Sequence, residues 1–144
     1  MAPTRIRNIG KYEVIDVIAR GGMGVVYKAT DPAMGRPVAI KMITSGFSDD
    51  PNLLQRFYRE PRSTGSLHHP NIVTVYDLGD DDGLPYLVME YLEGQTREQI
   101  IRTGKEMSIA EKLSLMVQVC SGLQYAHQRG IVHRDIKPAN IILT

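Results

Sequence analysis

Cysteine and long apolar runs are both scarce in this 144-residue chain. Its single cysteine, Cys120, has no second cysteine in the chain to pair with, so we expect a reduced, cytoplasmic environment. Nowhere do about eighteen apolar residues follow one another, and no long apolar run follows the basic residues near the N-terminus, so the sequence predicts neither a membrane span nor an export signal. The net charge of +1 gives no reason to expect nucleic acid or an anionic membrane as a partner.

The pattern of the chain changes once, near Gly94. Before this point the signals are mostly those of β-strands, and after it they are mostly helical, which predicts an α+β fold in two parts. We expect an N-terminal tail over residues 1–11, a β-rich part over 12–93 and a helical part over 94–144.

In the β-rich part, β-branched and apolar residues predict strands over residues 12–18, 25–30 and 37–43. The first two strands are joined by Ala19-Arg20-Gly21-Gly22-Met23-Gly24. Its glycines can let the backbone approach a ligand and offer N–H groups to phosphate oxygens, although most Gly-rich turns only reverse a hairpin. Lys41 lies within an apolar strand, where a charge is costly unless it has a partner or its head reaches water.

Further elements are predicted by caps and turns. A helix begins near Ser48 and reaches Glu60, next to Pro61, which disfavours helical geometry at Glu60. Strands over 72–78 and 85–91 flank a solvated acidic hairpin tip at Asp80–Asp82. Two helices follow, over 96–103 and from Ser108 to about Arg129. The second has an apolar stripe expected to be core, made of Leu113, Met116, Val117, Cys120, Leu123 and Tyr125.

The most informative stretch is His133-Arg134-Asp135-Ile136-Lys137-Pro138-Ala139-Asn140. Apolar residues at 131–132 and 141–143 predict short buried strands on both sides of this polar loop. In such a loop an aspartate can accept a hydroxyl proton, a lysine can meet a phosphate and an asparagine can hold a divalent cation. Packing alone does not require this order of groups.

This order resembles the catalytic loop of protein kinases, and Lys137-Pro138 is similar to the serine/threonine branch. The Gly-rich turn, the strand Val38-Ala39-Ile40-Lys41, and the helix end Tyr125-Ala126-His127 also resemble this family, its bacterial members most of all. The resemblance covers residues 12–144. It implies a protein-kinase-like fold with a five-stranded antiparallel N-lobe and one helix, plus the truncated start of a mainly helical C-lobe.

The resemblance implies ATP and Mg²⁺ as cofactors and a protein Ser or Thr hydroxyl as the substrate. Asp135 would accept the hydroxyl proton, Lys137 would steady the γ-phosphate and Asn140 would bind magnesium. Lys41, oriented by Glu60, would hold the α- and β-phosphates. The other nucleotide-binding residues that it implies form the glycine loop, the walls of the adenine pocket and the hinge backbone: Gly21, Gly22, Gly24, Ile18, Val26, Ala39, Met89, Glu90 and Leu92.

Three residues depart from the family pattern: Ala19 replaces the first glycine of the loop, Pro61 follows Glu60, and Arg97 stands where relatives usually have an apolar residue. The 144 residues also contain no Asp-Phe-Gly sequence, whose aspartate is the second magnesium ligand in the family. We therefore expect this chain alone to transfer phosphate poorly. The alternatives are an inactive nucleotide-binding or regulatory module, with a completing or regulatory protein partner, and a fragment without a function of its own.

Overall fold

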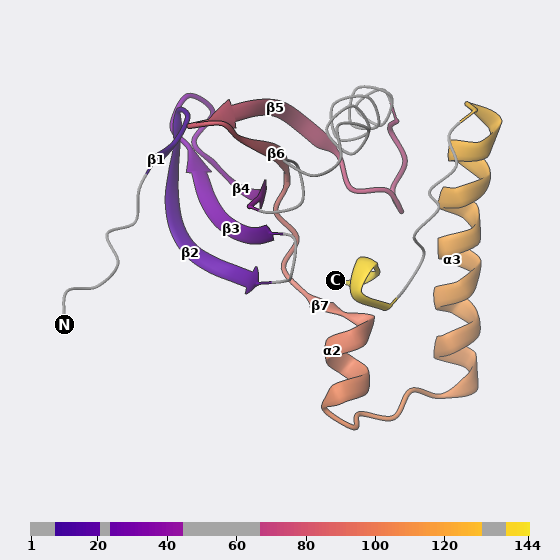
Figure 1. Ribbon diagram of the computed structural model, residues 1–144. Helices are drawn as coiled ribbons and strands as arrows, with labels where there is room; N and C mark the ends of the chain where they lie inside the picture. Colours follow the sequence, from indigo (N-terminus) through magenta and orange to yellow (C-terminus); the bar gives the residue numbers. More distant parts are fainter. Residues whose placement is uncertain (1–7, 21–23, 45–66, 131–137) are drawn as a thin grey trace. The chain divides into compact units, whose positions relative to one another are not determined.

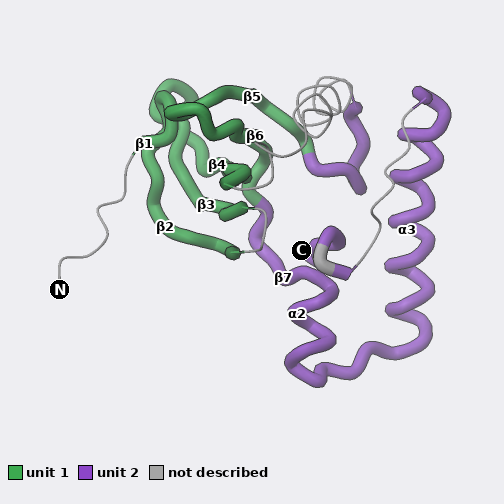
Figure 2. Tube along the Cα trace, in the orientation of Figure 1, with its two compact units in different colours: residues 1–66, 74–91 green, residues 67–73, 92–144 purple. Residues whose placement is uncertain are grey.

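The computed structural model describes residues 8–20, 24–44, 67–130 and 138–144, which belong to two compact units (Figure 2). Unit 1 comprises the N-terminal strands and residues 74–91, and unit 2 comprises residues 67–73 and 92–144. The helix expected to end near Glu60 lies outside the described residues. So do Gly21, Gly22 and the part of the polar loop that holds Asp135 and Lys137.

Unit 1 is a curled antiparallel sheet, and this confirms the predicted antiparallel architecture (Figure 1). One short strand at the edge, β1, had no signal in the sequence. The strand order is β1-β2-β3-β4-β6-β5. The bounds are β1 (Asn8–Ile9), β2 (Tyr12–Arg20), β3 (Gly24–Asp31), β4 (Arg36–Ile43), β5 (Val75–Asp81) and β6 (Leu84–Glu90).

The strand predicted from Ile72 begins later, at Val75. The backbone N–H of Ile72 donates to the carbonyl of His69 over 3.1 Å, so the chain is still turning where the apolar pattern indicated a strand. The prediction was wrong at this end because Ile72 has a strand-like side chain but closes the turn that begins at His69 and contains Pro70 and Asn71.

One face of the sheet forms the core of unit 1. Tyr27, Ile40 and Val88 are register partners across β3, β4 and β6, and partners in a ladder project to the same face. Ile40 and Val88 are fully buried, and a side chain of this kind contributes roughly 1.5–3 kcal/mol when it leaves water. The buried cluster on this face is Ile9, Tyr12, Ala29, Val38, Ile40, Met42, Tyr86 and Val88.

Unit 2 contains β7 (Gln95–Thr96), α2 (Arg97–Arg102), α3 (Ile109–Gln128), the 3₁₀ helix η1 (Pro138–Asn140) and β8 (Ile142–Leu143). β7 and β8 pair antiparallel, with Gln95 opposite Leu143. The strand expected over 141–143 is therefore present at 142–143, but it is not buried, because Ile142 is 40% exposed. Within the described residues no helix is long and apolar enough to cross a membrane.

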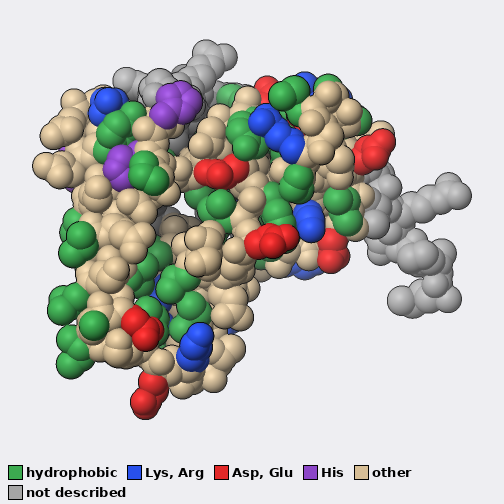
Figure 3. Space-filling model, turned by 180° about the vertical axis from the view of Figure 1, so that it is seen from behind, with side chains coloured by type: hydrophobic (Ala, Val, Ile, Leu, Met, Phe, Trp, Pro, Cys, Tyr) green, Lys and Arg blue, Asp and Glu red, His purple; other side chains and the backbone are tan. Residues whose placement is uncertain are grey.

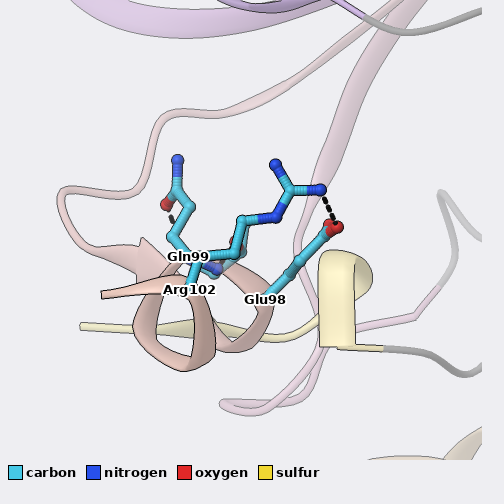
Figure 4. A network of polar contacts seen from close by, with 4 residues as sticks. Glu98, Gln99 and Arg102 are labelled. Atoms are coloured by element: carbon cyan, nitrogen blue, oxygen red, sulfur yellow. Dashed lines mark hydrogen bonds and ion pairs between the residues drawn. The ribbon is translucent and has the colours of Figure 1, made fainter. Parts of the chain in front are cut away.

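Both predicted helices of unit 2 are present, and α3 begins at the expected cap, Ser108. Thr96 forms a full capping box with Gln99, and the Ser108 hydroxyl accepts a hydrogen bond from the backbone N–H of Glu111. An ion pair of 2.7 Å between Arg102 and Glu98 lies on the surface of α2 (Figure 4). Because both side chains are largely exposed, this pair contributes little to stability.

The apolar stripe of α3, expected to be core, is largely exposed. Leu113 and Val117 are 61% and 68% exposed, and Met116 and Cys120 are exposed as well. Hydrophobic side chains are visible along this helix at the left of Figure 3. The prediction was wrong here because helical periodicity marks an apolar face without supplying a partner for it. The buried positions of α3 are Gly122 and Ala126.

Segment 67–73 packs on α3 through polar groups of its turn. His69 Nδ1 accepts a hydrogen bond from the backbone N–H of Asn71 (3.0 Å), and Nε2 lies 3.3 Å from Ser121 Oγ. The His69 ring also contacts the Tyr125 ring, with 5.1 Å between centroids. The Asn71 side chain donates to Gln118 over 3.2 Å. This histidine therefore joins two segments of unit 2.

Candidate functional site: one face of the N-terminal sheet

The face of the sheet opposite the core carries four of the predicted nucleotide-binding residues. Val26 is the register partner of Lys41, and Ala39 is the partner of Met89. Lys41 lies two residues after Ala39 in β4, so the two share a face. Residues Val26, Ala39, Lys41 and Met89 thus lie together, and we refer to them as the Lys41 face.

The Lys41 face combines an apolar surface with one charge in water. Ala39 is buried, and Val26 and Met89 are half-buried. Lys41 is exposed although β4 lies between β3 and β6, so its ammonium avoids the cost of burial that an apolar strand would otherwise impose. A flat apolar ligand with an anionic group would meet complementary chemistry here.

Lys28 also belongs to this side of the sheet, and no motif in the sequence indicated it. It is the register partner of Ala39, and its ammonium lies 4.5 Å from the centroid of the Tyr91 ring. This cation–π contact joins β3 to the residue that follows β6. The signal was available, since Lys28 stands two residues after Val26 and strand side chains alternate with period two.

Gly24, the last glycine of the Gly-rich turn, has a structural reason to be glycine. A Cβ at this position would collide with the backbone carbonyl of Met42 in β4. Close approach of the strands therefore excludes a side chain here, independently of any ligand. Gly24 is placed at the start of β3, two residues before Val26.

Ile18 and Ala19 lie near the end of β2, where the ladder is irregular. Val17 pairs with Tyr27 and Ala19 with Val26, so Ile18 is the extra residue of a bulge, and it is 44% exposed. Asp82 is the non-glycine residue with positive φ in the described part of the chain. Ala19 therefore does not have the positive φ that would favour a glycine at this position.

The last residue of β6, Glu90, is held on both sides. Glu90 is the register partner of Val38, and its backbone N–H donates to the Thr74 carbonyl over 2.9 Å. Its carboxylate oxygen Oε1 accepts a hydrogen bond from the Thr74 N–H over 2.8 Å. Leu92, which was also predicted to belong to the hinge, is half-buried. It is the first residue after β6 that belongs to unit 2.

The described part of the polar loop is its end, η1, in unit 2. Asn140 is exposed, and the next residue, Ile141, accepts a hydrogen bond from the backbone N–H of Arg97 over 2.7 Å. Lys41 belongs to unit 1 and Asn140 to unit 2. Across the described ranges, no group of three His, Cys, Asp or Glu side chains has the geometry of a metal site. Glu60, Asp135 and Lys137 lie outside these ranges.

Comparison with known proteins identifies the family. A family model described as protein kinase domain matches residues 12–144. The chain belongs to the protein kinase family. Its kinase fold is also similar to the crystal structure of the Mycobacterium tuberculosis PknI kinase domain, with a TM-score of 0.86 and 33% identity over 100% of this chain and 60% of that chain.

Curated relatives of this kinase chain are bacterial serine/threonine kinases, which confirms the resemblance seen in its motifs. It is 46% identical over 134 residues to the serine/threonine-protein kinase PrkC of Bacillus subtilis, covering 93% of this chain and 21% of that protein. It is 44% identical over 139 residues to a probable serine/threonine-protein kinase, SCO3848, of Streptomyces coelicolor, covering 94% of this chain and 21% of that protein. The chain thus spans about a fifth of the length of these relatives.

Proposed function

We propose that this chain supplies the nucleotide-binding lobe and the catalytic loop of a kinase that phosphorylates Ser or Thr residues of proteins, with ATP and Mg²⁺. Residues 12–93 would form the nucleotide-binding lobe. Residues 94–144 would form the start of the second lobe, which carries the catalytic loop. The observation that carries the proposal is the Lys41 face, where Lys41 stands beside three apolar side chains on the sheet surface opposite the core.

The chemistry of the Lys41 face suits a nucleotide. Adenine is flat and apolar on its two faces, so Val26, Ala39 and Met89 would contact the base, with Ile18 of β2 beside them. The Lys41 ammonium would hold the α- and β-phosphates under the Gly21–Gly24 loop. Glu60 would orient Lys41, and the backbone of Glu90 and Leu92 would bind the edge of adenine.

The polar loop supplies the groups for phosphoryl transfer. Asp135 would accept the proton of the substrate hydroxyl, Lys137 would steady the γ-phosphate, and Asn140 would bind one magnesium ion. Asn140 is exposed in η1, as a residue that meets a hydrated cation should be. The 144 residues contain no aspartate after Asp135. We therefore propose that this polypeptide by itself binds nucleotide but transfers phosphate inefficiently.

A second candidate is a regulatory or nucleotide-binding module that is completed by a protein partner. The exposed stripe of α3, with Leu113 and Val117 more than half exposed, favours it, because contiguous apolar surface on a soluble domain marks an interaction site. For both candidates we propose a cytoplasmic location, since the single cysteine, Cys120, is exposed and unpaired with any other cysteine.

Calorimetric titration of ATP and Mg²⁺ tests the nucleotide site. We expect wild type to bind and Lys41→Ala to bind at least about tenfold more weakly, because the variant loses a charge-assisted contact with the phosphates. Lys11→Ala is the matched control, since Lys11 is an exposed lysine of the same unit at the β1–β2 turn. Equal affinity in wild type and a folded Lys41→Ala variant would overturn the nucleotide site.

A phosphotransfer assay tests the second half of the proposal. Radioactive ATP, Mg²⁺ and a Ser/Thr-containing protein should yield little product with the 144-residue polypeptide. Robust transfer that disappears in Asp135→Asn would show that these residues suffice for catalysis and would overturn the statement that this polypeptide alone is inefficient.

A further inference from the structure

Glu90 makes an unusual exchange of hydrogen bonds at the end of the β5–β6 ladder. The last register pair is Val75 with Met89, so Thr74 and Glu90 stand at the next pair of positions. In a regular antiparallel pair of the hydrogen-bonded kind, the two residues exchange both N–H and carbonyl groups. The Glu90 N–H does donate to the Thr74 carbonyl, over 2.9 Å.

The reciprocal bond of that pair goes to the side chain instead. The Thr74 N–H donates to Glu90 Oε1 over 2.8 Å. In a regular ladder the same N–H would donate to the backbone carbonyl of Glu90. The carboxylate therefore takes the place of the residue's own carbonyl. The backbone of Thr74 is satisfied at both its N–H and its carbonyl, and the Glu90 carbonyl is not engaged by Thr74.

The position of this exchange relates it to the Lys41 face. Met89, which precedes Glu90, lies on that face as the partner of Ala39. A ligand whose ring contacts Met89 and Ala39 has its edge close to the backbone that follows Met89. The chemistry of the Glu90 carbonyl, an acceptor with two lone pairs, matches an amino group on that edge.

We propose that the Glu90 carboxylate is a positioning residue for the purine base. By binding the Thr74 N–H, it fixes the end of β6 and keeps the Glu90 carbonyl for the exocyclic amino group of adenine. Replacement of the carboxylate by a methyl group lets the Thr74 N–H close the ladder onto the backbone carbonyl of residue 90. The base then loses its acceptor, and preference for a 6-amino purine over a 6-oxo purine disappears. This inference rests on the proposed nucleotide site.

The experiment compares the affinities of ATP and inosine triphosphate, which differ in the group at purine carbon 6. We expect wild type to bind ATP about tenfold more tightly, since an unmatched hydrogen-bonding group costs on the order of one decade in affinity. Glu90→Gln, whose amide oxygen still accepts from Thr74, should keep this ratio, and Glu90→Ala should lower it toward one. The affinity for inorganic tripolyphosphate should be the same in all three proteins.

The controls separate the inference from the proposed function. Glu93→Ala removes a carboxylate three residues further on, in the connector that follows β6, and should leave the ATP/inosine triphosphate ratio at the wild-type value. A folded Glu90→Ala variant with the full wild-type ratio would overturn the role of the carboxylate while the nucleotide site stands. A folded wild type that binds neither nucleotide would overturn the nucleotide site and this role together. Thermal unfolding of each variant identifies any that has lost its fold; if Glu90→Ala has, Glu90→Leu, whose side chain likewise cannot accept from the Thr74 N–H, is measured in its place.

Discussion

The Tyr12 hydroxyl donates a hydrogen bond to Asp77 Oδ2 over 2.9 Å and joins β2 to β5. In the order of the sheet, these two strands are separated by β3, β4 and β6. A bond between them requires the sheet to curl until strands near its two edges approach each other (Figure 1). Tyr12, only 2% exposed, therefore links the sheet on the core side, opposite the Lys41 face.

This link predicts a loss of stability at alkaline pH. Burial, and then the hydrogen bond to Asp77, raise the pKa of Tyr12 above its ordinary value of 10.0. Above about pH 10 the unfolded chain gives up the Tyr12 proton while the folded chain retains it, so the folded state binds more protons and loses stability as the pH rises. Below about pH 10 this contribution is fully present.

Thermal melts of wild type and Tyr12→Phe from pH 8 to 11 check this prediction. We expect the phenylalanine variant to be less stable at pH 8 by about 1 kcal/mol, the net contribution of one hydrogen bond. Above pH 10 its stability should decrease less steeply with pH than that of wild type. Tyr86, whose pKa is also raised by burial, is retained in both proteins, so its titration cancels in the difference. Parallel curves above pH 10 would contradict the role of Tyr12.

Gly24→Ala should destabilise unit 1. The new methyl group would collide with the Met42 carbonyl, so β3 and β4 must separate at a cost of about 1–3 kcal/mol. Gly35→Ala is the comparison, because its Cβ would meet nothing within 4 Å and only its positive φ of 64° opposes the change, at about 1 kcal/mol. Chemical denaturation measures both variants. A smaller loss at Gly24 than at Gly35 would refute the close strand approach.

Ala19→Gly tests whether the missing first glycine harms the site. Ala19 lies in the ladder opposite Val26, with φ outside the left-handed region, so its methyl group strains nothing. We expect the glycine variant to be less stable by about 0.5–1 kcal/mol and to bind ATP with unchanged affinity. Tighter ATP binding by Ala19→Gly in calorimetry would show that the methyl group obstructs the nucleotide.

The exposed stripe of α3 should cause self-association of the 144-residue polypeptide. Val117→Lys places a charge on the stripe, and because Val117 is 68% exposed it should alter folding stability little while reducing association. Glu111→Gln changes the net charge by the same amount without touching the stripe. Light scattering at tens of micromolar measures the mass. Monodisperse monomers for wild type would rule out self-association through this face.

The sequence predicted most of the fold because the informative patterns are local. β-Branched and apolar residues located β2, β3 and β4, and the cap Ser108 located the start of α3. β1 was missed because a strand of two residues has no period. The start of β5 was misplaced because propensity at Ile72 competes with a turn that begins at His69.

The candidate site was predicted only in part, because a motif names residues without showing their pairing. Val26, Ala39, Lys41 and Met89 were named one by one, and the register of three strands brings them to one face. The contact of Lys28 with Tyr91 and the exchange of hydrogen bonds at Glu90 depend on that register, so no motif contains them. The roles of Asp135, Lys137 and Glu60 stay predictions.

The ladder between β7 and β8 has a mechanical consequence. Leu143 is paired with Gln95, and the Arg97 N–H donates to the Ile141 carbonyl, so backbone hydrogen bonds join residues 95–97, just after the connector, to residues 141–143, just after Asn140. A displacement of residues 95–97 must carry the backbone at 141–143 with it. Asn140, at the end of the polar loop, is therefore coupled to the connector through backbone hydrogen bonds. A point mutation that removes a side chain would leave these bonds in place.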